Sequence, residues 1–444
     1  MSLWPHQARA VAETRRLYRE GRRAPLIVLP TGGGKTRLAR HYVSAYAARD
    51  QSVLWLAHRD ELVGQATVEI TRGEDGVPVE RVTVLQGDRR PRAGASVTVA
   101  TVQTLAARLR RGADLPAADL VVFDEARHYA AADWREVASR YDAAFRIGLD
   151  ATPVRSDGSA LGDLFDSLVV GATVRELQAA GVLCPARVIG PDRATDGLSM
   201  EPAEAVAQWA PRGTPCVVFA GSVAEAREIA EAVGDRAAYV DGSQPLATRR
   251  ETLARFERGD VDVLVNVFLL TEGWDSPRMN AGDCTIVVAR GCGSWSMWRQ
   301  IIGRGMRVAA GPSRQPKTCT VVDLRGAVHA HGLPAEDVTF SLDGAGVTRP
   351  AAESLPPRCP TCWVVGEVGA DRRCGACGAL VPLVRERQKL TPERIAEIVA
   401  VETAEQKRAY LDRLRETASS KGYAAGWASH RYKAKYGTFP ARGA

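Results

Sequence analysis

The feature that most constrains this chain is a glycine-rich turn over 29–36, Leu-Pro-Thr-Gly-Gly-Gly-Lys-Thr. Four apolar residues at 26–29 predict a buried strand before it, and the stretch 36–48, which lacks Pro and Gly, predicts a helix after it. Strand, glycine-rich turn and helix in this order are typical of a P-loop, whose backbone N–H groups wrap a phosphate at a helix N-terminus. The alternative is a turn with an incidental lysine, because Leu29 stands where the full pattern begins with Gly.

The P-loop assigns chemistry to its polar residues. Lys35 is expected to reach the β- and γ-phosphates of ATP, and the Thr36 hydroxyl to hold Mg²⁺. Further upstream, Gln7 is a candidate reader of adenine, because a glutamine amide can pair with the N6/N7 edge of that base; an ordinary surface glutamine is the alternative. The full set expected to bind ATP within the P-loop is Thr31, Gly32, Gly33, Gly34, Lys35 and Thr36.

Length and composition predict a protein of two or three domains that each bury a core. The chain has 444 residues and a net charge of +7, a mild basic excess that suits a polyanionic partner. No signal-peptide pattern opens the sequence and no apolar run is long enough to span a bilayer, so a cytoplasmic, nucleoid-associated protein without membrane contact is expected. Of nine cysteines, four are closely paired, which favours a reducing compartment and one metal site over a disulfide framework.

Polar clusters follow the buried strands of the first half. Apolar runs at 53–57, 97–101, 120–123 and 145–149 alternate with helical stretches, which predicts an α/β fold with a doubly wound parallel sheet. Ligands of such sheets lie at the carboxyl ends of the strands. Asp124 is expected to hold Mg²⁺ there and Glu125 to polarise the attacking water. A helix start with dipole-favoured acids is an alternative for Glu125.

The same alternation begins again after a connector rich in Pro and Gly. Strands are expected at 216–220, 261–268, 285–289 and 318–324. A helix over 298–307 carries Arg304 and Arg307, which are three residues apart and so share a face.

Six stretches occur in the order of the motifs of superfamily 2 helicases, which this chain resembles over roughly residues 3–310. They are Gln7, the P-loop, Asp124-Glu125, Asp150-Ala-Thr-Pro153, Gly273-Trp-Asp275 and Gln300-x-x-Gly-Arg304-x-x-Arg307. The resemblance implies two tandem RecA-like domains with ATP between them. It also implies that Arg304 and Arg307 are arginine fingers, that Gln300 acts with them, and that Gly273 and Asp275 contact ATP.

The resemblance further implies a nucleic-acid path across both domains. The residues expected along it, each of which could equally be an ordinary loop or cap residue, are Arg59, Thr101, Gln103, Ser222 and Thr271. The expected division of the chain is a first RecA-like domain at 1–165, a connector at 166–205, a second RecA-like domain at 206–345, a zinc ribbon at 346–382 and a basic, aromatic region at 383–444.

Four cysteines near the C-terminus have the spacing of a structural zinc site. Two Cys-x-x-Cys pairs lie within nineteen residues, and each pair lets two thiolates converge on one ion. A closed tetrahedral site leaves no position for substrate, so its role is structural and it replaces a core that so short a segment lacks. The expected ligands are Cys359, Cys362, Cys374 and Cys377.

The last stretch, 421–444, contains basic and aromatic residues and no acid. This pattern suits single-stranded nucleic acid, with cations on phosphates and rings on bases; a helical unit that packs its aromatics on the main body is the alternative. Together with the zinc ribbon and the helicase-like core, the tail resembles bacterial RadD-type proteins and their phage-encoded relatives. That resemblance implies a role in DNA repair and recombination, with DNA and a single-stranded-DNA-binding protein as partners.

Two positions depart from the family pattern. Arg127 stands where the family usually has His or Asp, and Asp150 where it has Ser or Thr; Thr152 completes the motif. Since a lone buried Arg or Asp is costly, we expect the two to form an ion pair that couples ATP state to nucleic-acid binding. In the alternative, Arg127 turns to solvent or nucleic acid and His128 takes that role.

The sequence therefore predicts a DNA-dependent ATPase that translocates on DNA or remodels it, using ATP, Mg²⁺ and Zn²⁺. An RNA-directed or restriction-associated translocase is one alternative. A nucleic-acid-binding adaptor with little ATPase is another, which the intact set of expected catalytic residues disfavours.

Overall fold

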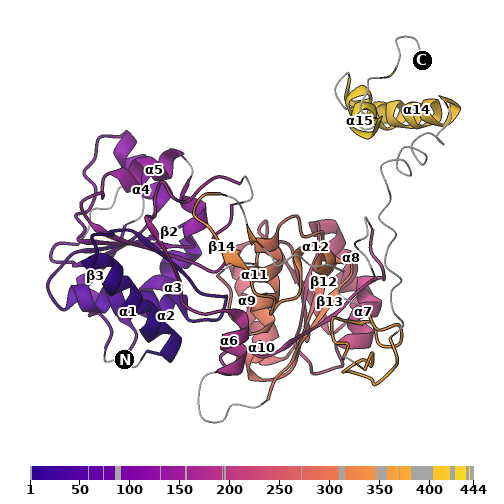
Figure 1. Cartoon of the computed structure of the whole chain (residues 1–444), viewed down its shortest axis with the longest axis horizontal. Helices are drawn as coiled ribbons and strands as arrows, with labels where there is room; N and C mark the ends of the chain where they lie inside the picture. Colours follow the sequence, from indigo (N-terminus) through magenta and orange to yellow (C-terminus); the bar gives the residue numbers. More distant parts are fainter. Residues whose placement is uncertain are drawn as a thin grey trace. The chain divides into compact units, whose positions relative to one another are not determined.

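The computed structural model describes residues 3–58, 60–73, 75–85, 92–130, 132–155, 158–192, 194, 197–271, 273–309, 316–344, 347–348, 358–369, 371–381, 404–420, 426–436 and 440. The chain forms two compact units, Met1–Val381 and Pro382–Ala444 (Figure 1). Within the described residues, the first unit contains two seven-stranded sheets, which confirms the predicted pair of α/β domains. No helix in the described part of the chain is both long and apolar enough to cross a membrane.

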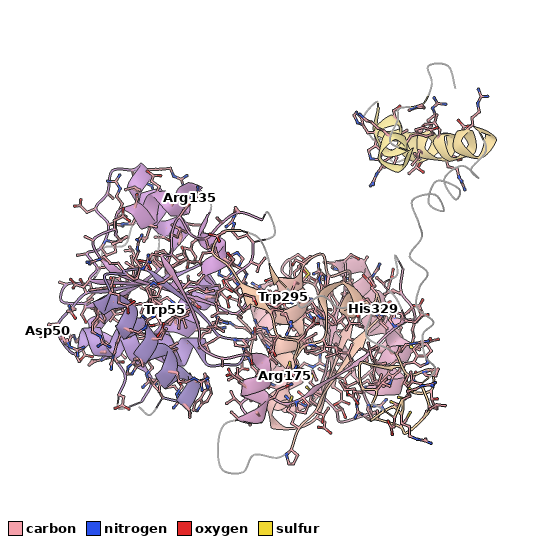
Figure 2. The ribbon with its side chains drawn as sticks, viewed as in Figure 1. Asp50, Trp55, Arg135, Arg175, Trp295 and His329 are labelled. Carbon is pink, nitrogen blue, oxygen red and sulfur yellow. The ribbon has the colours of Figure 1, made fainter. Side chains whose placement is uncertain are left out.

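The first sheet is parallel throughout and has the order β3-β4-β2-β5-β6-β1-β7. Its inner strands are buried on both faces, as continuous apolar runs predict for a sheet with helices on either side; Trp55 lies within this layer (Figure 2). The strands are β1 (Pro25–Val28), β2 (Val53–Ala57), β3 (Val82–Leu85), β4 (Val97–Thr101), β5 (Leu120–Asp124), β6 (Phe145–Asp150) and β7 (Ser167–Val170). The helices are α1 (Pro5–Arg19), α2 (Lys35–Ala47), α3 (Asp60–Thr71), η1 (Val79–Arg81), α4 (Val102–Arg110), η2 (Ala126–Ala130) and α5 (Ala132–Ser139).

The second sheet has the order β10-β11-β9-β12-β13-β8-β16, parallel except for β16 at its edge. Its strands are β8 (Ala186–Ile189), β9 (Cys216–Phe219), β10 (Ala237–Val240), β11 (Val263–Asn266), β12 (Cys284–Val288), β13 (Cys319–Asp323) and β16 (Val364–Val365). Its helices are α7 (Pro202–Trp209), α8 (Val223–Val233), α9 (Leu246–Arg258), α10 (Pro277–Ala281), α11 (Trp295–Gly305) and α12 (Ala327–His331).

The segment 166–205, expected to be a connector, contributes a strand to each sheet: β7 at the edge of the first, and β8 between β13 and the edge strand β16 in the second. β7 pairs with β1 in the first sheet, and β8 pairs with β13 in the second. The residues that pass between the sheets are therefore 171–185, which include α6 (Val174–Ala179).

The cysteine-rich segment is joined to the second domain rather than separate from it. β16 lies antiparallel to β8, with Val364 opposite Ile189. These two residues share a small core with Cys359, Cys374 and Val381. The segment thus extends both the sheet and the core of the domain that precedes it.

A second connection joins the two domains. After α12 the chain returns to the first domain, where the Leu342 carbonyl accepts hydrogen bonds from the Leu161 and Gly162 amides at 2.9 and 3.0 Å. The Leu342 side chain packs against a core of the first domain. We call residues 332–344 and 347–348, which include the paired strands β14 (Thr339–Phe340) and β15 (Val347–Thr348), the return strap.

The second unit contains two helices that pack on one another, α14 (Ala404–Ser420) and α15 (Trp427–Tyr436). Leu411 and Ala428 are buried in this pair. The Arg431 guanidinium lies 5.6 Å from the Trp427 ring centroid. Of the basic, aromatic tail at 421–444, residues 426–436 and 440 are among those described, and the rest lies outside them.

Candidate ATP and nucleic-acid site

The P-loop occupies the turn between β1 and α2. Gly32 and Gly34 have φ of +85° and +81°, values that favour glycine, and Gly34 is the N-cap of α2. Helix α2 begins at Lys35, so the first helical N–H groups, Lys35 and Thr36 meet at one point. This is the arrangement that binds a phosphate with its metal ion.

Two acids face the P-loop lysine. Asp124 ends β5, and the Glu125 carboxylate lies 3.7 Å from the Lys35 Nζ. Burial, together with the neighbouring Glu125 carboxylate, raises the pKa of Asp124 to about 7. A buried carboxylate of this kind fits a divalent cation. Thr36 and Asp124 would hold Mg²⁺, which supplies positive charge to the phosphates when bound.

The ion pair expected between Arg127 and Asp150 is present. An Arg127 guanidinium nitrogen lies 2.7 Å from Asp150 Oδ1, and the Arg127 backbone N–H donates to Asp150 Oδ2 at 2.7 Å. The Thr152 N–H also donates to Asp150, at 2.8 Å. Arg127 and Asp150 are 6% and 0% exposed, so the alternative in which Arg127 turns to solvent is wrong.

Arg127 has a second carboxylate partner that the sequence did not reveal. The same guanidinium nitrogen donates to Glu125. Glu125 itself has a φ of +55°, a strained value for a residue with a side chain. Arg127 therefore holds the acid expected to polarise water as well as the motif that contains Thr152.

Side chains of the second domain close the cleft over the P-loop. The Thr152 hydroxyl hydrogen-bonds to the Ser296 hydroxyl at 2.6 Å. A Cβ added to Gly303 would lie 2.6 Å from the Thr31 Cβ, so α11 touches the P-loop where only glycine fits. Gln300 is buried on the same helix.

The two expected arginine fingers have different surroundings. Arg304 donates three hydrogen bonds within its own domain, two to the Thr271 carbonyl at 3.0 and 2.7 Å and one to the Trp274 carbonyl at 2.6 Å. Arg307 is ion-paired with Asp275 at 2.6 Å, and its Cγ would lie 3.0 Å from a Cβ added to Gly32. In this structure, then, Arg307 lies against the P-loop, and Arg304 holds the loop that precedes Asp275.

Gln7, the candidate adenine reader, lies against the P-loop, and Gly273, one of the two further expected ATP contacts, lies against the first domain. Gln7 is fully buried: its oxygen accepts from the Trp4 N–H at 3.0 Å, and its amide donates to the Gly34 carbonyl at 3.0 Å. A ring nitrogen of His6 lies 2.9 Å from the Gly33 carbonyl oxygen. A Cβ on Gly273 would lie 2.7 Å from a Leu62 methyl, so Gly273 contacts α3.

The expected nucleic-acid residues have different surroundings: two are helix caps, one is exposed and one is buried. The Thr101 hydroxyl is the N-cap acceptor of α4, and the Ser222 hydroxyl is that of α8. Gln103 is exposed, and its amide donates to the His58 carbonyl at 3.3 Å. Thr271 is nearly buried, and its Oγ1 has no hydrogen-bond partner among the described residues. Arg59 lies outside the described residues.

The four paired cysteines converge as predicted. All four sulfur atoms lie within 4.8 Å of one another, with Cys359 and Cys377 at 3.6 Å and Cys362 and Cys374 at 3.6 Å. A tetrahedron with Zn–S bonds of about 2.3 Å separates its sulfurs by roughly 3.8 Å. The cluster therefore fits a zinc ion.

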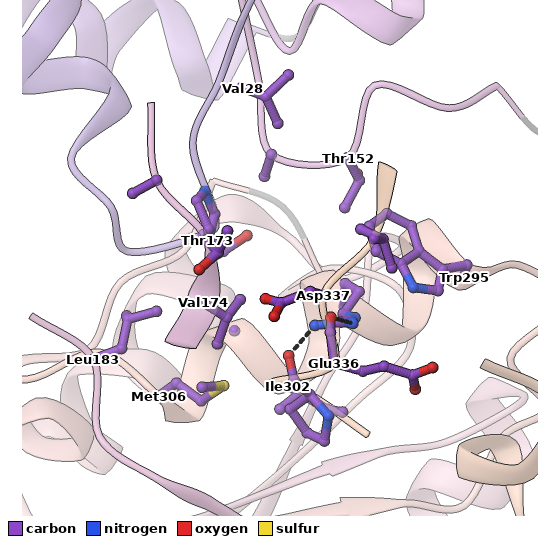
Figure 3. A pocket seen from close by; sticks show the side chains of 18 of the residues that line it. Val28, Thr152, Thr173, Val174, Leu183, Trp295, Ile302, Met306, Glu336 and Asp337 are labelled. Carbon is purple, nitrogen blue, oxygen red and sulfur yellow. Dashed lines mark hydrogen bonds between the residues drawn. The ribbon is translucent and has the colours of Figure 1, made fainter. Parts of the chain in front are cut away.

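An apolar pocket that the sequence did not predict lies between the domains (Figure 3). Val28 and Thr152 lie on one side, and Trp295, Ile302 and Met306 on the other. The return strap closes it, held by hydrogen bonds from Arg299 to the Pro334 and Glu336 carbonyls. No signal in the sequence could have revealed this pocket, because its walls come from several segments spread between Val28 and Phe340.

Comparison with known proteins finds two family models that match separate parts of the chain. Residues 1–155 match the family model described as the type III restriction enzyme res subunit, and residues 203–309 match the helicase conserved C-terminal domain. A 51.5 kDa protein of a Lactococcus phage (isolate 7-9) is 26% identical over 404 residues, which cover 85% of this chain and 82% of the phage protein.

Two further likenesses extend this picture. The ATP-dependent helicase IRC3 of Saccharomyces cerevisiae is 26% identical over 72% of this chain, but the match spans only 52% of the yeast protein. A fragment assigned to the HsdR subunit of a type I restriction enzyme from Vibrio vulnificus has a TM-score of 0.54 at 22% identity, and the likeness covers 77% of this chain and 70% of the fragment. The latter shows a shared fold.

Fold, motif order and these matches define a superfamily 2 helicase-type protein with a relative encoded by a phage. The chain is a nucleic-acid-dependent ATPase of that family.

Proposed function

We propose that this protein is a DNA-stimulated motor that translocates on DNA, or remodels it, in repair or recombination. ATP binds between the two RecA-like domains, and its hydrolysis alternately closes and releases the cleft. The observation that carries the proposal is the completeness of the cleft: Lys35, Glu125 and Arg127 form one charged cluster, and Arg307 lies beside Gly32. An adaptor without ATPase activity would have no use for this arrangement.

Each residue of the cleft has a separate task. Lys35 and the N–H groups at the start of α2 bind the phosphates, and Glu125 orients and polarises the attacking water. Arg307 supplies positive charge to the transferred phosphate from the second domain. Arg127 and Asp150 connect Glu125 to Thr152 through hydrogen bonds. Thr152 in turn bonds across the cleft to Ser296, so a movement of the second domain would change the position of Glu125.

Two features favour DNA as the polymer. The family model that matches residues 1–155 is that of a restriction-enzyme subunit, a class of enzyme that acts on DNA. The basic, aromatic tail adds a pattern suited to single strands. A repair role, a single-stranded-DNA-binding protein as partner and a location at the nucleoid remain predictions of the resemblance to RadD-type proteins.

The deciding experiment measures ATP turnover with no polymer, single-stranded DNA, duplex DNA, forked DNA and single-stranded RNA. We expect strong stimulation by single-stranded or forked DNA and weak stimulation by RNA. Stimulation by RNA alone would favour the RNA-directed alternative, and preference for long duplex would favour a restriction-type translocase. Turnover that stays at the level of Lys35→Ala with every polymer would favour the adaptor.

A further inference from the structure

The backbone and exposure of Phe268 are not explained by the fold. The residue follows β11, and its φ of +57° is in the left-handed region, which is unfavourable for a bulky side chain. The residue is 49% exposed, so only about half of its surface is buried in return. A strained backbone beneath an exposed aromatic ring points to a role outside the core.

A buried arginine supports one face of this ring. The Arg290 guanidinium carbon lies 3.4 Å from the Phe268 ring centroid, which is a close cation–π contact. Arg290 follows β12 and is only 8% exposed, so its side chain is held in place. Because the guanidinium covers one face, the exposed half of the ring comprises the opposite face and the edges.

The ring lies among residues expected to contact nucleic acid. In the second sheet β9 separates β11 from β12, so Phe268 and Arg290 meet across the carboxyl end of β9. That end leads through Gly221 into Ser222, and a Cβ on Gly221 would lie 4.0 Å from the Arg290 Cβ. Thr271 follows Phe268 by three residues, and its N–H donates to the Phe268 carbonyl at 3.4 Å.

Two polar atoms near the ring lack a partner. Arg290 Nη1 and Thr271 Oγ1 are buried and have no hydrogen-bond partner among the described residues. Buried donors without partners are costly in a folded protein, and a phosphate oxygen would satisfy either of them once its side chain turns toward the bound strand. The surroundings of Phe268 therefore combine an exposed aromatic face with unsatisfied donors.

We propose that Phe268, supported by Arg290, is a stacking platform for a nucleobase of the bound single strand. The ring would accept any base, because every base has a π face, and the adjacent donors would hold the phosphate of the same nucleotide. The platform rests on the proposed function, since it places one nucleotide of the polymer that stimulates ATP turnover.

The test compares the Phe268→Gly variant with the wild type in binding two fluorescent oligonucleotides of equal length, oligodeoxythymidylate and an abasic strand with the same phosphates. Glycine tolerates the positive φ and removes the whole side chain; relief of the backbone strain offsets the greater freedom of the unfolded chain, so the melting temperature should not fall. We expect the Kd for oligodeoxythymidylate to rise about tenfold. The Kd for the abasic strand should be equal in the two proteins, and Phe268→Trp should bind like the wild type.

Leu246, an equally exposed apolar residue at the start of α9, gives a matched control. Leu246→Ala should leave both Kd values unchanged. The platform is overturned if Phe268→Gly binds oligodeoxythymidylate normally, if it loses affinity equally for the abasic strand, or if it melts earlier. Binding is measured without ATP, so the Kd values test the platform independently of ATP turnover. A wild type that binds strands but shows no stimulated turnover would contradict the proposed function alone.

Discussion

Arg127 is the residue on which the ATP site depends most, because it contacts two carboxylates that belong to different motifs. It bonds to Glu125 on one side and to Asp150 on the other, and all three side chains are largely buried. In a site of this kind the loss of one partner leaves the other charge uncompensated, at a cost of about 3–5 kcal/mol. The pair is therefore expected to matter for stability as well as for coupling.

A double-mutant cycle tests this pair. Arg127→His and Asp150→Thr should each weaken stimulation of ATP turnover by DNA and lower the melting temperature, because each leaves a buried charge without its partner. The double variant restores the family's usual residues and should recover much of both losses. A coupling free energy of about 1 kcal/mol or more is expected; additive single effects would show that the ion pair has no such role.

Arg304 of α11 and Arg307, which lies just beyond the end of that helix at Gly305, should differ in their effects. Arg307→Ala is expected to lower DNA-stimulated turnover about a hundredfold or more at a nearly unchanged melting temperature, because its partner Asp275 is 55% exposed at the side chain. Arg304→Ala leaves the Thr271 and Trp274 carbonyls without donors and should destabilise the second domain. If turnover falls with Arg304→Ala at full stability and survives Arg307→Ala, the finger is Arg304.

Loss of the P-loop lysine or of the acid beside it gives a second test at this scale. Lys35→Ala and Glu125→Gln should each lower stimulated turnover about a hundredfold or more, since both act in the transition state. Glu125→Gln should still bind ATP, because the phosphates are held by Lys35 and the helix N-terminus. Nucleotide binding by fluorescence and turnover on the same samples separate the two roles, and normal turnover in Glu125→Gln would exclude it as the residue that polarises water.

At the scale of elements, the cysteine cluster supports more than its own segment. β16 pairs with β8, and Cys359 and Cys374 share a core with Ile189. Loss of the metal would free the edge of β8 and open that core. The zinc site should therefore stabilise the second RecA-like domain and not only the ribbon.

Metal analysis and thermal melting test this expectation. About one zinc per chain is expected in the wild type. Cys377→Ser should lose the zinc and lower the melting temperature, since metal binding and folding are coupled. Cys292→Ser, outside the cluster, is the control and should retain both. Soluble wild-type protein without zinc, or with a Cys359–Cys377 disulfide, would contradict the assignment.

At the scale of the whole molecule, the chain consists of a motor unit and a separate helical pair. Deletion of Pro382–Ala444 removes the second unit as a whole and should leave the melting of the first unchanged. DNA binding should weaken, and its dependence on salt should become shallower, because cations that neutralise phosphates are lost. Unchanged binding together with a less stable motor unit would instead favour a packing role for the tail.

What the sequence by itself determined is confined to short stretches. The P-loop, the Asp124-Glu125 pair and the cysteine pairs each carry their chemistry within a few residues, so spacing alone predicts which atoms can converge. The alternating apolar runs were likewise sufficient to predict two sheets of mainly parallel strands. Even the ion pair of Arg127 with Asp150 could be predicted, because both lie at the carboxyl ends of strands of one sheet and neither charge could be buried alone.

The tertiary structure decided everything that depends on which strand ends are neighbours. Only the closed cleft shows that Arg307 lies beside Gly32 whereas Arg304, three residues earlier, is bound to a loop of its own domain. Only the order of the second sheet brings Phe268 to Arg290. The physical reason is that strand order and domain closure arise from packing between segments far apart in the chain, which leaves no periodicity in the local sequence.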